Sequence, residues 1–530
     1  MHSSSITLVF LSFTLVQEAV ASVAYCSNQD FESGALGESP YQTYHAAPYL
    51  PVQLNYALPS DDCPANSQVE GYFFFAPEGP IAMPGGGLIM NPNGTMVYSA
   101  SAFEPSFLRG IQSYNGSDHI TLWIGDGSPV TGGHGSGYNI LLDNTYAVVA
   151  NFTVVNLGVG ADIHELQITS NNTAVMTAYP TQAANLSAYN GPSDGYVLNC
   201  AAQEVDISTG KALFTWQPLN HVDPSECYAA IGEAGSGTAD DPWDYFHINS
   251  IQKIDDGNYF ISSRQRVLCH TLYLVNPAGD ILWRMGGMKS DFSFGQGANF
   301  SWQHHARMHD DSTTISLFNN GASEYDQDFP YSQGLLINFD EASRTVTLNN
   351  ARSPFNRTVT TAQGSVQLLE NGDSFVGWGA MPYFSQHDAS GNIMWSAQFA
   401  PSENEVSAYR IFLHDWVARP ITPPSMSISS SSNSTNAVVY AWWNGATEVT
   451  AWKLMGSTAL MPLAAEALNV VGKVDFETAL TYTGIRQYAF FQVAALNAKG
   501  EILEYSGFTA LNGTSFAKAD NQTATAAPLN

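Results

Sequence analysis

Three histidines occupy matching places in a pattern that recurs along the middle of this chain. Each lies eight to ten residues before a turn residue of its own copy: His164 before Asn172, His247 before Gly257, and His304 before Ser312. If the copies pack around one axis, the residues that precede their first strands crowd around one mouth of a central channel, so we expect these imidazoles to converge. An imidazole can attack an electrophile or carry a proton near neutral pH. Matching positions in three copies favour a shared site over three unrelated structural histidines.

Two further polar residues belong to the same predicted cluster. Asn249 follows His247 by two residues, so both side chains face the same side of a strand. Arg264 lies on the next strand of the same copy and is one of only 18 Lys and Arg residues in the chain. A guanidinium, an amide and several imidazoles can together stabilise a developing oxyanion or hold a sulfate.

Metal binding is the alternative use of three histidines. Arg264 would lie close to such an ion, and its positive charge opposes a divalent cation. We therefore expect neither a metal nor another cofactor.

A glycine-rich loop and several aromatic residues adjoin these positions. His134 lies in the loop 132–137, which lacks the Lys-Ser/Thr ending of a phosphate-binding loop. Contact with a ligand and simple loop flexibility both explain such a loop. The aromatic residues beside the histidines either floor a pocket or pack in the core; they are Trp302, Trp243, Tyr245 and Phe246.

The pattern that positions the histidines consists of four short strands joined by Asn, Asp and Gly turns. One copy has strands at 251–254, 259–262, 271–275 and 280–283, the last ending in an aromatic residue. Further copies cover 366–395, 166–216 and, less clearly, 306–348; residues 86–149 can supply a fifth, and 40–75 with 405–416 a sixth. Short strands at this period predict four-stranded blades packed around a channel, because one blade alone leaves an apolar face exposed. We predict an all-β fold, a six-bladed β-propeller over residues 22–422, with stacked sandwiches as the alternative.

The end of the chain has a different pattern. Residues 423–436 are rich in Pro and Ser, which predicts a linker. Residues 437–517 include a strictly alternating segment that ends in an Asn/Gly turn, typical of a fibronectin-type-III-like β-sandwich. A polar tail, 518–530, follows.

Composition limits the class of partner. The 530 residues are 44% hydrophobic and 12% charged, which excludes a disordered chain. The formal net charge of -29 repels nucleic acid and anionic lipid, and it favours neutral or apolar small molecules over anionic ones.

The N-terminus predicts export. A hydrophobic run over residues 6–16 precedes Ala19-Val20-Ala21, a small-x-small cleavage signal, so we interpret residues 1–21 as a signal peptide rather than a buried strand. The run is too short to span a bilayer. A secreted or luminal chain exposes its Asn-x-Ser/Thr sequons to glycosylation. There are ten of them, at Asn93, Asn115, Asn151, Asn171, Asn185, Asn299, Asn356, Asn433, Asn512 and Asn521.

Five cysteines lack metal-ligand spacing, and an oxidising compartment favours disulfides between them. Cys26–Cys63 and Cys200–Cys227 are plausible pairs, which leaves Cys269 free. The sequence does not decide this pairing.

Several motifs carry a resemblance to the fungal arylsulfotransferase-like family over roughly residues 40–510. They are Asp162-Ile163-His164-Glu165, Asp244-Tyr245-Phe246-His247-Ile248-Asn249-Ser250, Ile261-Ser262-Ser263-Arg264, Trp283-Arg284-x-Gly286-Gly287, Phe300-Ser301-Trp302-Gln303-His304-x-Ala306-Arg307 and Trp443-Asn444-Gly445-Ala446-Thr447. The resemblance implies a six-bladed propeller. In bacterial aryl sulfotransferases of this fold one histidine accepts the sulfuryl group, and the matching position here is His304. The matching sulfate-holding residues are His247, Asn249 and Arg264, with His164 as a further donor.

The same family includes fungal hetero-Diels–Alderases, which couple a tropolone quinone methide to a humulene-type sesquiterpene. We predict an enzyme of this kind acting on a phenol-like aromatic, with aryl sulfotransfer through a sulfohistidine as the alternative and a non-catalytic binding propeller as a third reading. The predicted catalytic residues are His304, His247 and Arg264. The predicted substrate-binding residues are His164, Asn249, His134, Trp302 and Phe246. The oligomeric state stays open.

Overall fold

The structure is a computed structural model, and it describes most of the chain. The described residues are 28–57, 69–82, 86–103, 106–126, 133–226, 231–264, 270–309, 312–324, 326–401, 406–430, 436–460 and 465–516. The predicted signal peptide and the predicted polar tail lie outside them. None of the helices in this described part has the length and apolar character that crossing a bilayer requires.

The regular structure of the described chain is almost all β-strand, as predicted, and six of its sheets share one plan. Each contains four antiparallel strands in a row. The first three sheets are β28 (Phe412–His414), β2 (Tyr72–Phe75), β3 (Leu88–Met90) and β4 (Met96–Ser99); β5 (Ser106–Tyr114), β6 (Ser117–Asp126), β7 (Ser136–Leu142) and β8 (Val148–Phe152); and β9 (Leu166–Ile168), β10 (Thr173–Ala178), β13 (Ala201–Asp206) and β14 (Lys211–Trp216). The other three are β15 (Ile248–Lys253), β16 (Tyr259–Ser263), β17 (Thr271–Val275) and β18 (Ile281–Gly286); β20 (His304–Met308), β21 (Thr314–Asn319), β22 (Gln333–Asp340) and β23 (Thr345–Arg352); and β24 (Ser365–Leu368), β25 (Ser374–Gly377), β26 (Tyr383–His387) and β27 (Ile393–Gln398).

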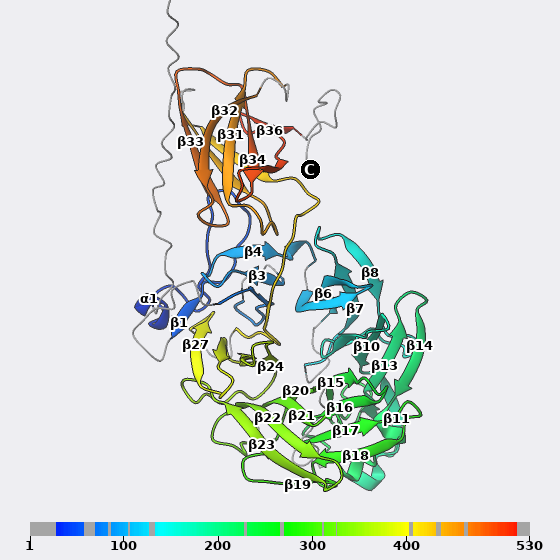
Figure 1. The fold of residues 1–530 in the computed structure, drawn as a ribbon. Coiled ribbons are helices and arrows are strands. Elements are labelled where there is room, and N and C mark those ends of the chain that lie inside the picture. The colour runs from blue at the N-terminus through cyan, green and yellow to red at the C-terminus, as the bar shows by residue number, and fades with distance from the viewer. Residues whose placement is uncertain are drawn as a thin grey trace, which may run out of the picture.

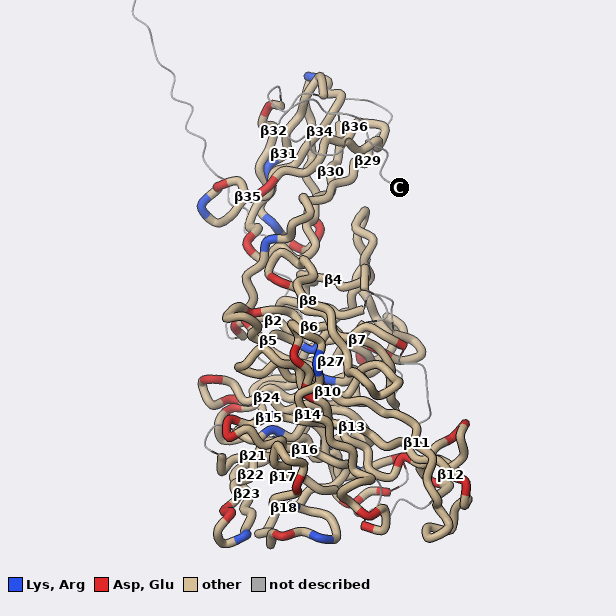
Figure 2. Tube along the Cα trace, turned by 90° about the vertical axis from the view of Figure 1, so that its right-hand side faces the viewer, with Lys and Arg blue, Asp and Glu red and all other residues tan. Residues whose placement is uncertain are grey.

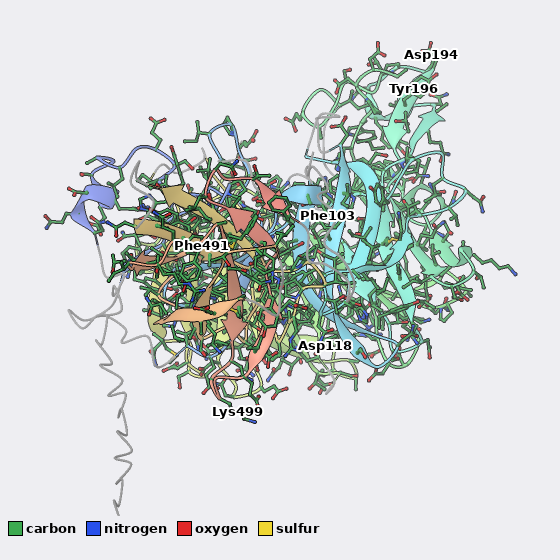
Figure 3. All side chains as sticks on the ribbon, turned by 90° about the horizontal axis from the view of Figure 1, so that it is seen from above. Phe103, Asp118, Asp194, Tyr196, Phe491 and Lys499 are labelled. Atoms are coloured by element: carbon green, nitrogen blue, oxygen red, sulfur yellow. The ribbon has the colours of Figure 1, made fainter. Side chains whose placement is uncertain are left out.

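A few elements lie outside this plan. β1 (Asn55–Ala57) adds a fifth strand beside β27, and β19 (Ser293–Phe294) runs parallel to β23. A hairpin of β11 (Thr181–Ala184) and β12 (Gly195–Leu198) interrupts the third sheet, and Figure 3 shows its residues Asp194 and Tyr196 projecting from the body of the molecule. The helices are short: α1 (Gln29–Glu32) and four 3₁₀ turns at Ser101–Phe103, Ser187–Tyr189, Pro218–Asn220 and Pro224–Glu226.

The six sheets lie around a common centre (Figure 1). Their innermost strands contact one another in the series β28, β5, β9, β15, β20 and β24, and β24 contacts β28 again. A separate apolar cluster fills the space between each pair of neighbouring sheets. Each sheet thus buries both faces against its neighbours, which is what short strands of mixed apolar and polar residues require.

Local turn chemistry sets the strand ends. In the β15–β16 hairpin, the Asp256 carboxylate accepts a hydrogen bond from the Asn258 amide at 2.8 Å, and the Gly257 amide donates to the Ile254 carbonyl at 2.9 Å. Gly257 has a φ of +88°, which glycine adopts without strain. The predicted turn at this position is confirmed.

Two predicted copies differ from the structure. Residues 86–149 do not form one copy, because β3 and β4 belong to the first sheet and β5–β7 to the second. Residues 40–75 are likewise divided, since β1 pairs with β27 whereas β2 pairs with β28. The pairing of β2 with β28, more than 300 residues later, closes the series of sheets, and it confirms that part of the predicted pairing of 40–75 with 405–416.

The end of the chain forms two further sheets above the six (Figure 1). One contains β29 (Ser425–Ser430), β30 (Asn436–Trp442) and β33 (Thr478–Thr483). The other contains β32 (Glu466–Gly472), β31 (Ala451–Ser457), β34 (Phe490–Leu496), β36 (Phe508–Ala510) and β37 (Ser515–Phe516), with β35 (Ile502–Tyr505) beside β34. Phe491, labelled in Figure 3, belongs to the apolar cluster between these sheets. The linker prediction for residues 423–436 is wrong over Ser425–Ser430, because this serine-rich segment pairs with β30 along its whole length.

The structure also bears on the predictions for the cysteines, the glycosylation sequons and the charged residues. Cys200 is a buried free thiol, so the pairing of Cys200 with Cys227 is wrong; the other four cysteines lie outside the described residues. Eight sequon asparagines are described, and all are exposed except the half-buried Asn93. Asn433 and Asn521 lie outside the described residues. Figure 2 shows acidic residues spread along peripheral loops.

Candidate active site

Three imidazoles meet at the centre of the six sheets. The ring centroids of His134 and His247 are 4.9 Å apart, those of His164 and His247 are 4.9 Å apart, and those of His134 and His164 are 5.5 Å apart. These residues immediately precede strands β7, β9 and β15 of three different sheets. The convergence predicted for His164 and His247 is observed, and His134 from the glycine-rich loop joins them.

Two buried carboxylates orient these rings. Asp244 Oδ2 lies 2.7 Å from His247 Nδ1 and 2.9 Å from His134 Nε2. Asp162 Oδ2 lies 2.5 Å from His164 Nδ1. Because a carboxylate accepts at Nδ1, the Nε2 atoms of His164 and His247 are left for other contacts.

Burial and the carboxylates decide the charge of these groups. Burial lowers the pKa of His247 to about 3, although the attraction of Asp244 opposes this effect. Burial lowers the pKa of His164 in the same way. Burial alone would raise the pKa values of Asp162 and Asp244, but the adjacent imidazoles hold them well below the usual range. At neutral pH, His164 and His247 are therefore neutral imidazoles beside two anionic carboxylates.

The backbone is strained at His247 and at two residues that flank His304. His247, Trp302 and His305 have φ values of +54°, +57° and +49°, in the left-handed region that non-glycine residues seldom adopt. Strain of this kind costs on the order of 1–3 kcal/mol for each residue and persists only where surrounding contacts enforce it. At His247 the carbonyl accepts the Arg264 amide at 3.1 Å, which ties the residue to β16.

His304 begins β20 and has a separate environment. Its Nδ1 lies 2.6 Å from Asn320 Oδ1, and its Nε2 accepts the backbone amide of Gln363 at 3.2 Å. Burial, and next the charge of Arg264, lower its pKa well below the usual value. The Tyr409 ring contacts both His304 and His164, with centroid distances of 6.4 and 5.5 Å. His304 is thus a neutral imidazole with both nitrogens engaged.

Glu78 reaches the same region from the loop after β2. Its Oε1 accepts a hydrogen bond from Gln363 Nε2 at 3.0 Å, and the Gln363 backbone contacts His304. Burial raises the pKa of Glu78 to about 7, although hydrogen bonds from Gln363 and from residues 407 and 409 oppose the rise. A carboxyl group with this pKa exchanges its proton near neutral pH.

Arg264 and Asn249 lie in the same region, and each has a polar side-chain atom without a hydrogen-bond partner among the described residues. Arg264 Nη2 donates to the Thr361 carbonyl at 2.6 Å, and its guanidinium lies 5.8 Å from the Trp302 ring. Asn249 Nδ2 donates to the Gln303 carbonyl at 2.6 Å. Arg264 Nε and Asn249 Oδ1 have no hydrogen-bond partner among the described residues.

The aromatic neighbours are divided between the site and the core. Trp302 lies under Arg264 and donates from Nε1 to Asp328 at 3.1 Å. Phe246 instead packs in the apolar cluster between two sheets, together with Trp243 and Tyr245, so the structure does not bring it to the histidines. These residues precede β15, and the left-handed backbone of His247 separates its side chain from theirs.

Several residues of the site were missed from the sequence. Asp162 and Asp244 precede their histidines by two and three residues, and that spacing was an available signal. No local signal marked Glu78 or Tyr409. Nor did any mark Tyr179, which stacks on His134 with a centroid distance of 3.8 Å.

The centre also contains potential metal ligands. His134, Asp244 and His247 form one set, and His134, Asp162 and His164 another, with the donor atoms of each set within 4.8 Å of one another. Arg264 was the reason to expect no metal, but the sequence argument did not include the two carboxylates in these sets, of which Asp244 acts on Arg264. The same groups equally form a chain of imidazole–carboxylate pairs that can hold or move a proton.

Comparisons with known proteins add a family and distant structural likenesses. No curated protein matches the chain. A protein of unknown function from Bacteroides caccae is 9% identical, with 64% of this chain and 98% of that chain covered and a TM-score of 0.38. Saccharomyces cerevisiae Sqt1 is 11% identical, with 70% and 78% covered and a TM-score of 0.30, and a streptogramin B lyase is 10% identical, with 83% and 95% covered and a TM-score of 0.30. None of these likenesses bears on what this chain does.

The family match covers the sheets that carry the histidines. The family model described as Arylsulfotransferase (ASST) matches residues 110–400, more than half of the 530 residues. The matched segment contains His134, His164, His247 and His304, as well as both orienting aspartates. The chain therefore belongs to the arylsulfotransferase (ASST) family.

Proposed function

We propose that the chain is a secretory-pathway enzyme that acts on a hydroxylated aromatic compound by proton transfer. The best-fitting reaction is the hetero-Diels–Alder coupling of a tropolone quinone methide with a humulene-type sesquiterpene. The observation that carries this proposal is the pairing of Asp244 with His247 and of Asp162 with His164. A carboxylate at Nδ1 fixes the tautomer in which Nε2 is free to accept a proton.

The proton balance of the first step suits this site. A hydroxymethyl tropolone becomes a quinone methide by losing one molecule of water. A base takes the proton of the ring hydroxyl, and an acid gives a proton to the departing hydroxyl group. His247, oriented by Asp244, is the proposed base, and Glu78, with a pKa of about 7, is the proposed acid. The cycloaddition itself moves no proton and requires only that the two reactants lie in the correct orientation.

The remaining groups have binding roles in this proposal. Arg264 Nε is a donor without a partner among the described residues and suits a tropolone oxygen. Asn249 Oδ1 is an acceptor that also lacks a partner among the described residues, and it suits a hydroxyl group. Trp302 supplies an aromatic wall beside Arg264.

Aryl sulfotransfer is the second candidate, and the family match favours it. In that reaction His304 Nε2 would attack the sulfur of an aryl sulfate, release the phenolate, and later pass the sulfuryl group to a second phenol. Two features weigh against it. His304 Nε2 already accepts the Gln363 amide, and the carboxylates of Asp162 and Asp244 repel an anionic sulfate.

The experiment compares both reactions on the same protein. Purified protein is incubated with a hydroxymethyl tropolone and humulene, and the coupled product is measured by liquid chromatography and mass spectrometry. We expect coupling above the uncatalysed rate, strongly reduced by His247→Gln and unchanged by His221→Gln, which alters an exposed histidine. A parallel incubation with an aryl sulfate is followed by intact mass. A sulfuryl adduct that disappears with His304→Ala would replace the coupling proposal by sulfotransfer.

The proposal also covers the domain organisation of the chain and its export. We infer that residues 22–422 form a six-bladed propeller, supported by six four-stranded sheets whose inner strands contact in a closed series. The two C-terminal sheets fit a fibronectin-type-III-like sandwich that begins at β29. The exposed sequons fit a glycosylated protein that is secreted or luminal.

A further inference from the structure

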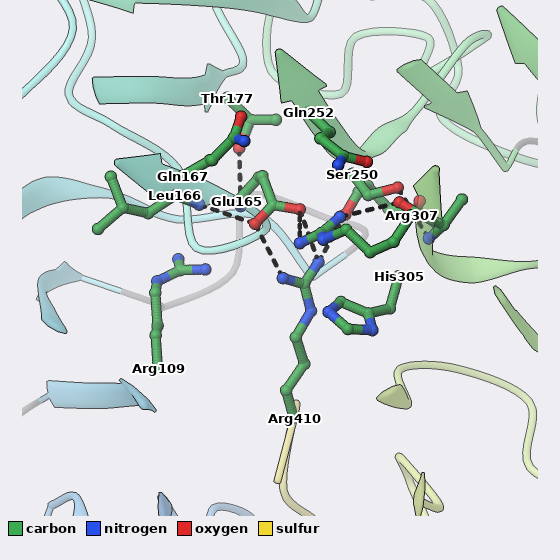
Figure 4. A network of polar contacts seen from close by, with 12 residues as sticks. Arg109, Glu165, Leu166, Gln167, Thr177, Ser250, Gln252, His305, Arg307 and Arg410 are labelled. Atoms are coloured by element: carbon green, nitrogen blue, oxygen red, sulfur yellow. Dashed lines mark hydrogen bonds and ion pairs between the residues drawn. The ribbon is translucent and has the colours of Figure 1, made fainter. Parts of the chain in front are cut away.

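A second charged cluster lies beside the histidines, and its carboxylate is already satisfied. Glu165 follows His164 and is buried. Its two oxygens accept hydrogen bonds from Arg410 Nη1 at 2.9 Å and Arg410 Nη2 at 3.2 Å, from Arg307 Nη2 at 2.7 Å, and from the Leu166 amide at 3.0 Å. Figure 4 shows these donors meeting Glu165 from different sides. A carboxylate has about four lone-pair positions, so Glu165 can take no further donor.

Arg109 is the third guanidinium of this cluster, and it has no carboxylate. Its Nη2 donates to the backbone carbonyls of Asp162 and Ile163. Its Nε and Nη1 have no partner among the described residues, and neither does Arg410 Nε. Arg109 and Arg410 are only 9% and 7% exposed. Figure 4 shows Arg109 extended toward the cluster without a bond to Glu165.

The neighbouring groups balance this positive charge only in part. The Asp162 carboxylate is anionic and acts on Arg109, and it is already bonded to His164, to the Gly135 amide and to the Thr177 hydroxyl. His305 is buried, and burial lowers its pKa well below the usual value, so it is neutral. The three guanidiniums thus lie beside two carboxylates, Glu165 and Asp162, which leaves one positive charge in excess, in a chain whose overall charge is strongly negative. Buried donors of a charged group without acceptors are unfavourable, so an acceptor is expected.

A cavity of about 10 Å³, room for one water-sized group, adjoins these side chains. Arg109, Tyr409 and Arg410 line it, and most of its other walls are apolar, including Leu108 and Ile163. No carboxylate side chain is among its lining residues. Two planar guanidiniums in an otherwise apolar cavity match the shape and charge of a small anion.

We propose that this cavity binds a single monatomic anion of chloride size between the guanidiniums of Arg109 and Arg410. The anion balances the excess charge and joins sheets that these residues come from, since Arg109 lies on β5 and Arg410 precedes β28. Its effect is on stability, so the inference is independent of the reaction proposed above. None of these residues has a part in that reaction.

Thermal unfolding under controlled anion composition tests the proposal. The protein is exchanged into sodium gluconate, whose anion is too large for the cavity, and gluconate is replaced stepwise by chloride at constant ionic strength. We expect Tm to rise with the logarithm of chloride concentration above Kd, because a ligand that binds only the folded state stabilises in proportion to ln(1 + [L]/Kd). Arg109→Gln should abolish this rise. Arg486→Gln, which alters an exposed ion pair with Glu466, should retain it.

Crystals soaked in sodium bromide give an independent measurement on the unaltered protein. We expect an anomalous peak between Arg109 and Arg410. A Tm that does not rise with chloride, an unchanged response in Arg109→Gln, or no bromide peak in the cavity would each overturn the proposal. If Arg109→Gln does not fold, the titration and the bromide peak of the unaltered protein decide the matter.

Discussion

Replacing Asp244 by asparagine removes the charge that orients two histidines at once. Asp244 Oδ2 lies 2.9 Å from His134 Nε2 and 2.7 Å from His247 Nδ1. Hydrogen bonds to a charged group contribute about 1.5–3 kcal/mol each, and neutral ones about half of that. Asparagine has nearly the same shape but keeps only a neutral acceptor. The two weakened bonds together therefore lose about 2–3 kcal/mol.

We expect most of this loss to appear in turnover. At 1.36 kcal/mol for each tenfold change, kcat of the coupling reaction should fall about 30- to 150-fold. Asp244 is a positioning residue that acts through His247, so KM should change little. The pKa of His247, followed by NMR, should fall further, because the attraction of Asp244 is the largest effect opposing burial. A purely structural role would leave that pKa unmoved.

The control is Asp118→Asn, which alters an exposed carboxylate on β6 (Figure 3). It should leave kcat and Tm unchanged. If Asp244→Asn keeps kcat within twofold of the unaltered protein while His247 retains its pKa, the proposed imidazole–carboxylate pair has no part in catalysis.

Three further predictions concern stability and pH. Burial lowers the pKa of His387 to about 4, so the unfolded chain binds one more proton than the folded chain between pH 6.5 and 4, and the free energy of unfolding should fall by about 3 kcal/mol as pH drops through this window. His387→Gln should reduce the slope of unfolding free energy against pH by one proton. An equal slope in both proteins would contradict the assignment. Glu78→Gln should remove an ionisation near pH 7 from the pH–rate profile, and its persistence would mean that another group titrates there. Gly445→Ala should lower the free energy of unfolding by about 2–4 kcal/mol, because φ is +97° and the added carbon would lie 2.3 Å from the Tyr146 ring. Gly472→Ala, whose added carbon meets nothing within 4 Å, should leave stability unchanged. Equal Tm values for the two variants in thermal melts would refute the clash.

Elements of the fold that depend on neighbouring residues were predictable. The strand at Thr271–Val275 was predicted with the limits that the structure has, because its apolar residues lie between turns with clear Asn, Asp and Gly signals. The meeting of His164 and His247 was also predictable, since equivalent places in repeated sheets must lie close together. The strand at Ser425–Ser430 was missed because a serine-rich composition is typical of linkers, and only its pairing with β30 makes it a strand.

Other features depended on contacts between distant residues. Residues 86–149 divide between two sheets because β28, from near residue 412, occupies the place beside β2. Phe246 was assigned to the site beside His247, but it faces the core between sheets. The left-handed backbone at His247 turns its side chain away from that of its neighbour in sequence, and no local pattern predicts this conformation.

The sequence by itself determined the all-β class, the repeated sheets, the family and the histidines of the centre, because strand pattern, turns and repeat positions are local properties. Only the tertiary structure decided that Glu78 reaches His304 through Gln363, and that Arg410 bonds to Glu165 across 245 positions of sequence. It also decided which guanidinium lacks a carboxylate. The physical reason is that charges and hydrogen bonds at the centre depend on how six sheets pack together, and no single sheet contains that information.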